Sequence, residues 1–286
     1  MISIPPKPYV DPLVEMIELR SEINGRSYEV RIGLPLSYHK GEGSYPLLVV
    51  LDADMIFGMS HEISMAEAMW SMAPKPDQVQ VPEMIVVGIS LPDRATNPLR
   101  RNHEYMPKMD PAELSAETRD YLANVTRMLG VELETGGAPD FLEILRTEII
   151  PLMEAHYRVD TQRRILTGVS ASGTFCCYTL FTRPDSFTDY IIVSPGLMGG
   201  EINRLESAWA RQNDDLRAGV LLTAGGAEIA DPFLIYSATA RMAEQLGARH
   251  FPGLRLHSWF IPGATHVQTA APSISRGLVT LLGTKS

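Results

Sequence analysis

The chain has 286 residues, of which 45% are hydrophobic, and its formal net charge is −9 at pH 7. This length and apolar content are enough to bury one large core, either as a single α/β domain or as one domain with an insertion. No block of Lys or Arg stands out, so the acidic charge argues against nucleic acid or an anionic membrane as a partner, and we expect a small-molecule substrate.

The N-terminus and the cysteines narrow the class further. The N-terminus lacks a basic stretch followed by an apolar one, and no apolar run approaches the roughly 18 residues that a membrane span needs. We therefore expect a soluble cytoplasmic protein. The two cysteines, Cys176 and Cys177, are adjacent and are expected to be buried thiols, and the sequence has no zinc-ligand spacing. No metal or organic cofactor is expected.

The N-terminal region predicts an arm and a hairpin. Prolines are frequent over residues 1–12, which favours an extended arm on the surface. Apolar or alternating residues over 14–23 and 27–34 flank Asn24-Gly25, a pair that is typical of tight hairpin turns. Two antiparallel strands are therefore expected to open the fold.

Two continuous apolar runs follow, over residues 46–51 and 84–89. Such runs are typical of strands that are buried on both faces of a parallel sheet. Between them, Ser60 to Met72 has helical spacing with a stripe of methionines, which we interpret as core packing.

The alternation of strands and helices stops between Leu91 and Ala138, where prolines interrupt a polar stretch. A helix is expected over residues 111–129. Segments of this kind in α/β proteins often lie at the carboxyl edge of the sheet, where ligands bind. We therefore expect a single domain over residues 1–286 with a small cap insertion over residues 95–137.

The alternation resumes in the second half of the chain. The sequence predicts helices over residues 140–156, 171–181, 203–212, 232–246 and 269–282, and strands over residues 163–168, 190–193, 219–223 and 254–260. Strands that alternate with helices at this spacing indicate an α/β fold with a doubly wound, mainly parallel sheet.

The strand that ends at Gly168 runs directly into a small-residue helix start, with Ser170 at the junction. A strand–Ser–helix elbow exposes a serine hydroxyl near a base and near backbone N–H donors, which is what a serine nucleophile needs. The usual elbow pattern is Gly-x-Ser-x-Gly, and here Ser172 occupies the place of the second glycine. By itself, a Gly-x-Ser-x-Ser sequence also fits an ordinary helix N-cap. The strand–turn–helix context favours a nucleophilic serine instead.

Candidates for the other two members of a catalytic triad follow in the order that α/β hydrolases use, Ser then Asp or Glu then His. Glu228 and Asp231 come after the strand over residues 219–223, and His266 comes after the next strand. Asp231 precedes Pro232 and fits a helix N-cap, so Glu228 is the better candidate for the acid. His266 lies in a loop with no apolar face to cover it.

These residues, with several other stretches, resemble the esterase-D-type "putative esterase" family of α/β hydrolases, which includes siderophore esterases that open enterobactin-like trilactones. The resemblance covers most of the chain from Pro46 onward. It is carried by residues 50–54, 101–107, 150–160, 163–173, 180–187, 193–196, 225–228 and the loop around His266. Together these motifs are specific for the family, whereas each motif alone is a weak signal.

The resemblance implies a role for each matching position. Ser170 would be the nucleophile, His266 the base and Glu228 the acid. The N–H of Ala171, with that of Ala53 or Asp54, would hold the oxyanion. Arg101 matches a position that faces the substrate in the family, although an arginine that tethers a loop is the alternative.

The chain also departs from the family pattern. The family usually has Gly-His-Ser-Leu-Gly-Gly at the elbow, where Val169, Ala171 and Ser172 stand here, and Ala53 replaces a glycine. The sequence therefore predicts a serine esterase that acts on a carboxylic ester or lactone through an acyl-enzyme. Two alternatives stay open: an acyltransferase or cyclase that uses the same acyl-enzyme, and a catalytically silent homologue that binds a ligand.

Overall fold

The computed structural model describes residues 10–71, 79–92, 97–197, 199–231 and 233–285. Most of the expected N-terminal arm lies outside these ranges, as do Met72, Pro232 and the first two residues of the expected cap insertion. Among the described residues, no helix is long and apolar enough to cross a membrane.

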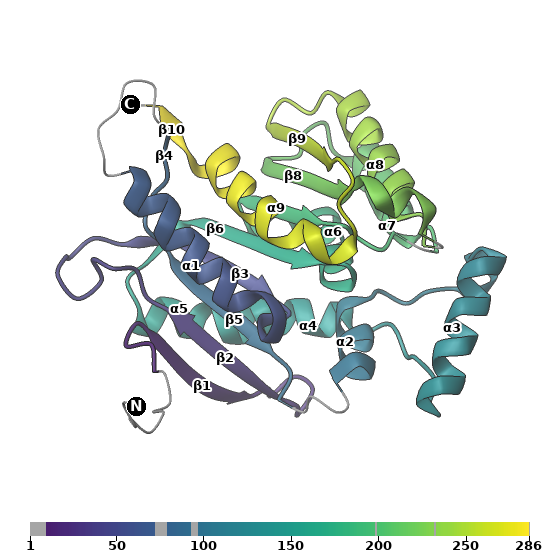
Figure 1. Ribbon diagram of the computed structural model, residues 1–286, viewed down its shortest axis with the longest axis horizontal. Helices are drawn as coiled ribbons and strands as arrows, with labels where there is room; N and C mark the ends of the chain where they lie inside the picture. The colour runs from purple at the N-terminus through teal and green to yellow at the C-terminus, as the bar shows by residue number, and fades with distance from the viewer. Residues whose placement is uncertain (1–9, 72–78, 93–96, 198, 232, 286) are drawn as a thin grey trace, which may run out of the picture.

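The centre of the molecule is an eight-stranded sheet (Figure 1). In spatial order its strands are β1 (Val14–Arg20), β2 (Ser27–Gly33), β5 (Ile85–Ser90), β3 (Tyr45–Leu51), β6 (Val159–Val169), β7 (Asp189–Val193), β8 (Ala218–Gly225) and β9 (Leu254–Ile261). The strands from β5 to β9 are parallel, whereas β1 pairs with β2, and β2 with β5, in the antiparallel sense. The predicted mainly parallel sheet with an N-terminal hairpin is thus confirmed.

Helices cover both faces of the sheet (Figure 1). The first face is covered by α1 (Ala53–Ser71) and α9 (Ala270–Gly277), which share one apolar cluster. The cluster on the other face draws residues from α4 (Ala138–Ile144), α5 (Ile150–His156), α6 (Ala171–Thr182), α7 (Glu201–Gln212) and α8 (Ile235–Arg249). Alternate residues of β3 enter the two clusters, which explains why its sequence is a continuous apolar run rather than an alternating one.

Several helices begin or end away from their predicted positions. The first helix starts at Ala53, directly after β3, and not at Ser60. The helix expected over 140–156 contains a π-helical turn over Leu145–Ile149, next to Pro151, which cannot donate a backbone hydrogen bond. A similar π-helical turn over Leu278–Leu282 follows α9. The last strand, β10 (Thr284–Lys285), pairs with β4 (Val79–Gln80) as a small separate sheet.

Between β5 and α4, the residues that the structure describes form two α-helices rather than the one expected. These are α2 (Asn97–Tyr105), which the sequence did not predict, and α3 (Ala116–Leu129), preceded by a short 3-10 turn over Pro111–Glu113. Helix α2 packs against α4 and α6. Helix α3 stands apart from the sheet at the end of the molecule (Figure 1).

Both cysteines are buried in α6 and unpaired, as predicted. Burial raises the pKa of the Cys177 thiol to about 12, so it stays protonated at neutral pH.

Candidate active site

Ser170 lies at a sharp turn between a strand and a helix. Strand β6 ends at Val169 and α6 begins at Ala171, and Ser170 between them has φ 63° and ψ −120°. A positive φ is unfavourable for a residue with a side chain, and it persists only where neighbouring contacts hold it. Here the Ser170 N–H donates to the Val193 carbonyl at 3.0 Å, and the Thr174 N–H donates to the Ser170 carbonyl at 2.9 Å. The predicted elbow is therefore present.

The crowding inside the elbow explains the first glycine of the motif and also the departure at Ser172. A Cβ at Gly168 would lie 2.5 Å from the Ser172 carbonyl oxygen, so only glycine fits there. The Ser172 side chain is fully buried, and its hydroxyl accepts from the Val169 N–H at 2.8 Å and donates to Asp52 Oδ2 at 2.6 Å. Serine is thus accommodated because its hydroxyl is satisfied on both sides.

Glu228 and His266 meet at the carboxyl edge of β8 and β9. Glu228 follows β8 and is 2% exposed, and its Oε1 contacts His266 Nδ1. Its Oε2 accepts from the Gly225 N–H at 2.5 Å and from the Ser194 hydroxyl at 2.8 Å. An ionised carboxylate can only accept, so Nδ1 carries the proton and Nε2 is left as the basic nitrogen.

The environment keeps Glu228 ionised. Burial alone would raise the pKa of this carboxyl, but the hydrogen bonds from His266, the Gly225 N–H and Ser194 outweigh burial, and the pKa is lowered from its ordinary value. The group therefore remains an acceptor and a negative charge beside the imidazole at neutral pH.

Asp231, the alternative acid, is used elsewhere. Its Oδ1 accepts from the Phe233 N–H at 2.8 Å, and its carbonyl accepts from the Leu234 N–H at 2.9 Å. It closes the short 3-10 turn that contains Glu228 and is not the N-cap of the following helix, because α8 begins only at Ile235. The prediction that Asp231 caps the following helix is therefore wrong. Asp231 does bind nearby backbone N–H groups, as a residue with a structural role would.

Ser194 is a site residue that the sequence did not single out. It follows β7 with φ 44°, is fully buried, and lies 3.0 Å from Thr269 Oγ1 in addition to Glu228. Thr269 in turn donates to the His266 carbonyl at 2.8 Å. The sequence signal that could have identified Ser194 is its position directly after a strand, at the carboxyl edge of the sheet. These contacts join the loops that follow β7, β8 and β9.

Ser170 belongs to the same edge of the sheet. Its N–H bonds to Val193, and the next residue, Ser194, bonds to the carboxylate that holds His266. Among the residues that the structure describes, no hydrogen bond joins the Ser170 hydroxyl to the imidazole. Such bonds are often long or poorly aligned without substrate and tighten when it binds.

Two helix N-termini lie side by side at the elbow. Strands β3 and β6 are neighbours, with Val50 opposite Thr167, and they lead into α1 and α6. The N–H groups of the first residues of a helix have no partner within that helix. The predicted oxyanion donors, Ala171 with Ala53 or Asp54, are therefore at positions where such N–H groups occur.

Arg101 projects from α2 onto the same region and binds protein groups. Its Nε and Nη2 donate to the Asp52 carboxylate at 2.6 and 2.7 Å, and Nη2 also donates to the Val169 carbonyl at 2.9 Å. Burial alone would lower the pKa of the guanidinium, but the charge and hydrogen bonds of Asp52 outweigh it and the pKa is raised. Contact of Arg101 with substrate stays a prediction.

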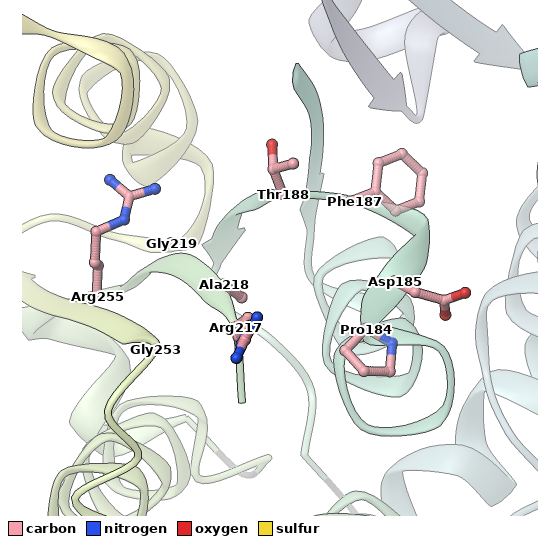
Figure 2. Close-up of a pocket in the computed structure, with 9 residues that line it drawn as sticks. All are labelled: Pro184, Asp185, Phe187, Thr188, Arg217, Ala218, Gly219, Gly253 and Arg255. Atoms are coloured by element: carbon pink, nitrogen blue, oxygen red, sulfur yellow. The ribbon is translucent and has the colours of Figure 1, made fainter. Parts of the chain in front are cut away.

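A hollow of about 270 Å³ lies at the opposite edge of the sheet (Figure 2). It is lined by residues at or before the beginnings of β7, β8 and β9, including Thr188, Gly219 and Arg255. Arg255 is already paired with Asp189 at 2.6 Å. This hollow is therefore separate from the triad candidates, which follow the ends of the same strands.

Among the described residues, no group of three or more His, Cys, Asp or Glu side chains is arranged to hold a metal ion.

Comparison with known proteins finds similar sequences among esterases. A family model described as "Putative esterase" matches residues 126–224. The chain is 25% identical over 272 residues to the ferri-bacillibactin esterase BesA of Bacillus subtilis (strain 168), which covers 93% of this chain and 87% of that protein. It is 24% identical over 209 residues to a siderophore triacetylfusarinine C esterase of Aspergillus fumigatus, covering 72% of this chain and 63% of that protein.

The fold also matches solved structures. The BES protein from Bacillus cereus superposes with a TM-score of 0.79 at 21% identity, covering 98% of both chains. The siderophore hydrolase EstA from Aspergillus nidulans superposes with a TM-score of 0.78 at 18% identity, covering 96% of both chains.

Proposed function

Because this chain belongs to the "Putative esterase" family of carboxylic ester hydrolases, with the α/β-hydrolase fold, we propose that it cleaves its ester or lactone through an acyl-enzyme at Ser170. The observation that carries this proposal is the contact of buried Glu228 with His266, at the same edge of the sheet as an elbow serine at positive φ. The three residue types and their chain order match what this chemistry needs.

In this mechanism His266 acts as the base. Its Nε2 takes the proton of the Ser170 hydroxyl as the oxygen attacks the ester carbonyl, and Glu228 stabilises the imidazolium that forms. The imidazolium then protonates the leaving alcohol, and the acyl group stays on Ser170. A water molecule, activated by His266 in the same way, releases the acid and restores the serine.

The negative charge on the carbonyl oxygen is met by backbone donors. The Ala171 N–H and the N–H of Ala53 or Asp54, at the starts of α6 and α1, would point at the oxyanion. Loss of one such donor typically raises the barrier by about 3 kcal/mol.

A siderophore ester or lactone is the first substrate class to test. Two relatives carry names that specify siderophore esters, ferri-bacillibactin and triacetylfusarinine C. The identities near 25% and the altered elbow leave the acyl group and the alcohol open, so the test needs a panel of simple esters, thioesters, lactones and siderophore esters.

The direct test is labelling by a fluorophosphonate probe together with turnover on this panel. We expect the probe to label Ser170, and Ser170→Ala to lose both labelling and hydrolysis. A variant that still turns over at the wild-type rate would refute the proposal. Labelling without hydrolysis of any member of the panel would instead indicate acyl transfer to another acceptor.

A further inference from the structure

We propose that Asp52, Arg101 and Ser172 form a clamp that positions the oxyanion donors of α1 against the Ser170 elbow, an inference that rests on the function proposed above. In this role Arg101 acts on the reaction through Asp52 and not by touching the substrate. The three members come from three separate segments: the loop after β3, helix α2 and helix α6.

The Asp52 carboxylate is the centre of the clamp. Asp52 is 6% exposed, has φ 55°, and directly precedes Ala53, the first residue of α1. Its two oxygens receive the two bonds from Arg101 and the bond from Ser172, all between 2.6 and 2.7 Å. Charge-assisted, bidentate bonds of this kind fix geometry more tightly than neutral ones.

The clamp also fixes the residue before the nucleophile. The Val169 N–H donates to Ser172 Oγ at 2.8 Å, and the Val169 carbonyl accepts from Arg101 Nη2 at 2.9 Å. Both backbone groups of Val169 are therefore tied to clamp residues. These two hydrogen bonds explain how the strained backbone at Ser170, with φ 63°, is held next to the start of α1.

Ser172 completes the clamp because it is not glycine. A glycine at this position, as in the usual elbow pattern, would provide neither the bond to Asp52 nor the bond to Val169. The serine hydroxyl links the elbow of α6 directly to the loop that begins α1. This link is a feature of the present chain at the very position where its sequence departs from the motif.

Arg101 has an electrostatic role as well. The Asp52 charge lies one residue from the proposed oxyanion donors, and an unneutralised carboxylate there would oppose the negative charge that develops in the transition state. The guanidinium cancels that charge. The competing hypothesis, which the variants below test, is that a substrate oxygen binds Nη1, the one guanidinium nitrogen of Arg101 with no hydrogen bond to a described residue.

The test compares kcat, KM and the rate of inactivation by a small fluorophosphonate in a set of variants. We expect Arg101→Gln to lower kcat and the inactivation rate together by about a hundredfold, with KM within about twofold, because charge compensation and orientation are both lost. Adding Asp52→Asn should restore about tenfold, since the uncompensated charge is removed. Ser172→Ala should lower both rates by about tenfold.

Arg100→Gln is the matched control. Arg100 lies next to Arg101 on α2 but pairs with Glu104 at 2.9 Å and not with Asp52. This variant should lose thermal stability while both rates stay within about twofold of the wild type. Folding of each variant is checked by circular dichroism, and Ser172→Ala, the smallest change, tests the clamp even if Arg101→Gln does not fold.

Three results would overturn the clamp. The first is a rise in KM for Arg101→Gln with kcat and inactivation unchanged, which would make Arg101 a substrate ligand. The second is a double variant no faster than Arg101→Gln alone, and the third is wild-type rates in Ser172→Ala. Absence of labelling and hydrolysis in the wild-type protein would instead refute the proposed function.

Discussion

At the residue scale, the candidate site depends on how the second oxygen of Glu228 is used. One oxygen contacts His266, and the other is held by the Gly225 N–H and the Ser194 hydroxyl. These bonds lock the carboxylate in one orientation, so the imidazole it contacts is locked as well. Orientation and a fixed tautomer are what an acid of this kind contributes to the base.

The first prediction compares Glu228→Gln with Asp231→Asn. A neutral amide at 228 removes the counter-charge of the imidazolium and allows the wrong tautomer, so kcat should fall by up to about 10⁴-fold. Asp231 supports only a local turn through the Phe233 N–H, so Asp231→Asn should keep nearly full kcat. Steady-state kinetics and melting curves on both proteins provide the measurement, and the reverse ranking would assign the role to Asp231.

At the scale of elements, the order of strands and helices was predictable, whereas helix starts set by distant contacts were not. The runs of β3 and β5, the hairpin and the elbow all follow from local residue patterns. The start of α1 does not, because it is set at Asp52, whose carboxylate is held by Arg101 and Ser172 from far along the chain. Local propensity cannot reveal such contacts.

The candidate site shows the same division. The turn at Ser170 and the contact of Glu228 with His266 could be predicted because each of these residues follows a strand in a recognisable order. Ser194 and the clamp could not be, since their roles are hydrogen bonds between segments that only the fold brings together. The anchoring of α2 has the same origin: Glu104, 1% exposed, is bound by Arg100 and by Arg26 from the turn of the N-terminal hairpin.

The second prediction concerns α3. Met128 in this helix is 76% exposed. The segment after α3 is tied to the body of the protein by two backbone hydrogen bonds, from the Gly136 N–H to the Met106 carbonyl and from the Gly137 N–H to the His103 carbonyl. Replacing residues 115–130 by a short Gly/Ser linker should leave folding and fluorophosphonate labelling nearly unchanged. If this segment covers the site, kcat/KM for bulky esters relative to a small acetate ester should change by about tenfold or more.

The measurement is a ratio, so it separates substrate contact from general damage. Equal loss on bulky and small esters, with slower labelling, would mean that the segment supports the fold or the elbow. An unchanged ratio with full activity would contradict the assignment of residues 95–137 as a cap.

At the scale of the whole molecule, the two edges of the parallel sheet have different roles. The carboxyl edge gathers Ser170, Ser194, Glu228 and His266, one after each of the neighbouring strands β6 to β9. The amino edge of the same strands carries the hollow of Figure 2 and the pair of Asp189 with Arg255. We therefore expect substitutions at the amino edge to change stability without changing the chemistry.

The last prediction uses Arg255→Gln for this purpose. Asp189 is 4% exposed, and it accepts from Arg255 at 2.6 Å and from Thr188 at 2.8 Å. Removing the arginine leaves a buried carboxylate with less compensation, so the free energy of unfolding at pH 7 should fall by about 1–3 kcal/mol. Because Arg255 lies at the opposite edge from the triad candidates, kcat and KM should stay within about twofold of the wild type.

The pH dependence fixes the cause of that loss. Burial already raises the pKa of Asp189 above its ordinary value of 3.8, against the lowering effects of Thr188 and Arg255, and without Arg255 it should rise further. When the pKa of a carboxyl is higher in the folded state than in the unfolded state, its ionisation destabilises the fold. This loss of stability is complete above the folded-state pKa and disappears as the pH falls to the unfolded-state pKa. The deficit of Arg255→Gln relative to the wild type should therefore be largest near neutral pH and shrink toward pH 4. Denaturant titrations of both proteins across this pH range measure the difference in the free energy of unfolding. The double variant Asp189→Asn/Arg255→Gln is the control and should show no such pH dependence. A difference that is independent of pH would mean that Arg255 contributes through packing and not through the charge of Asp189.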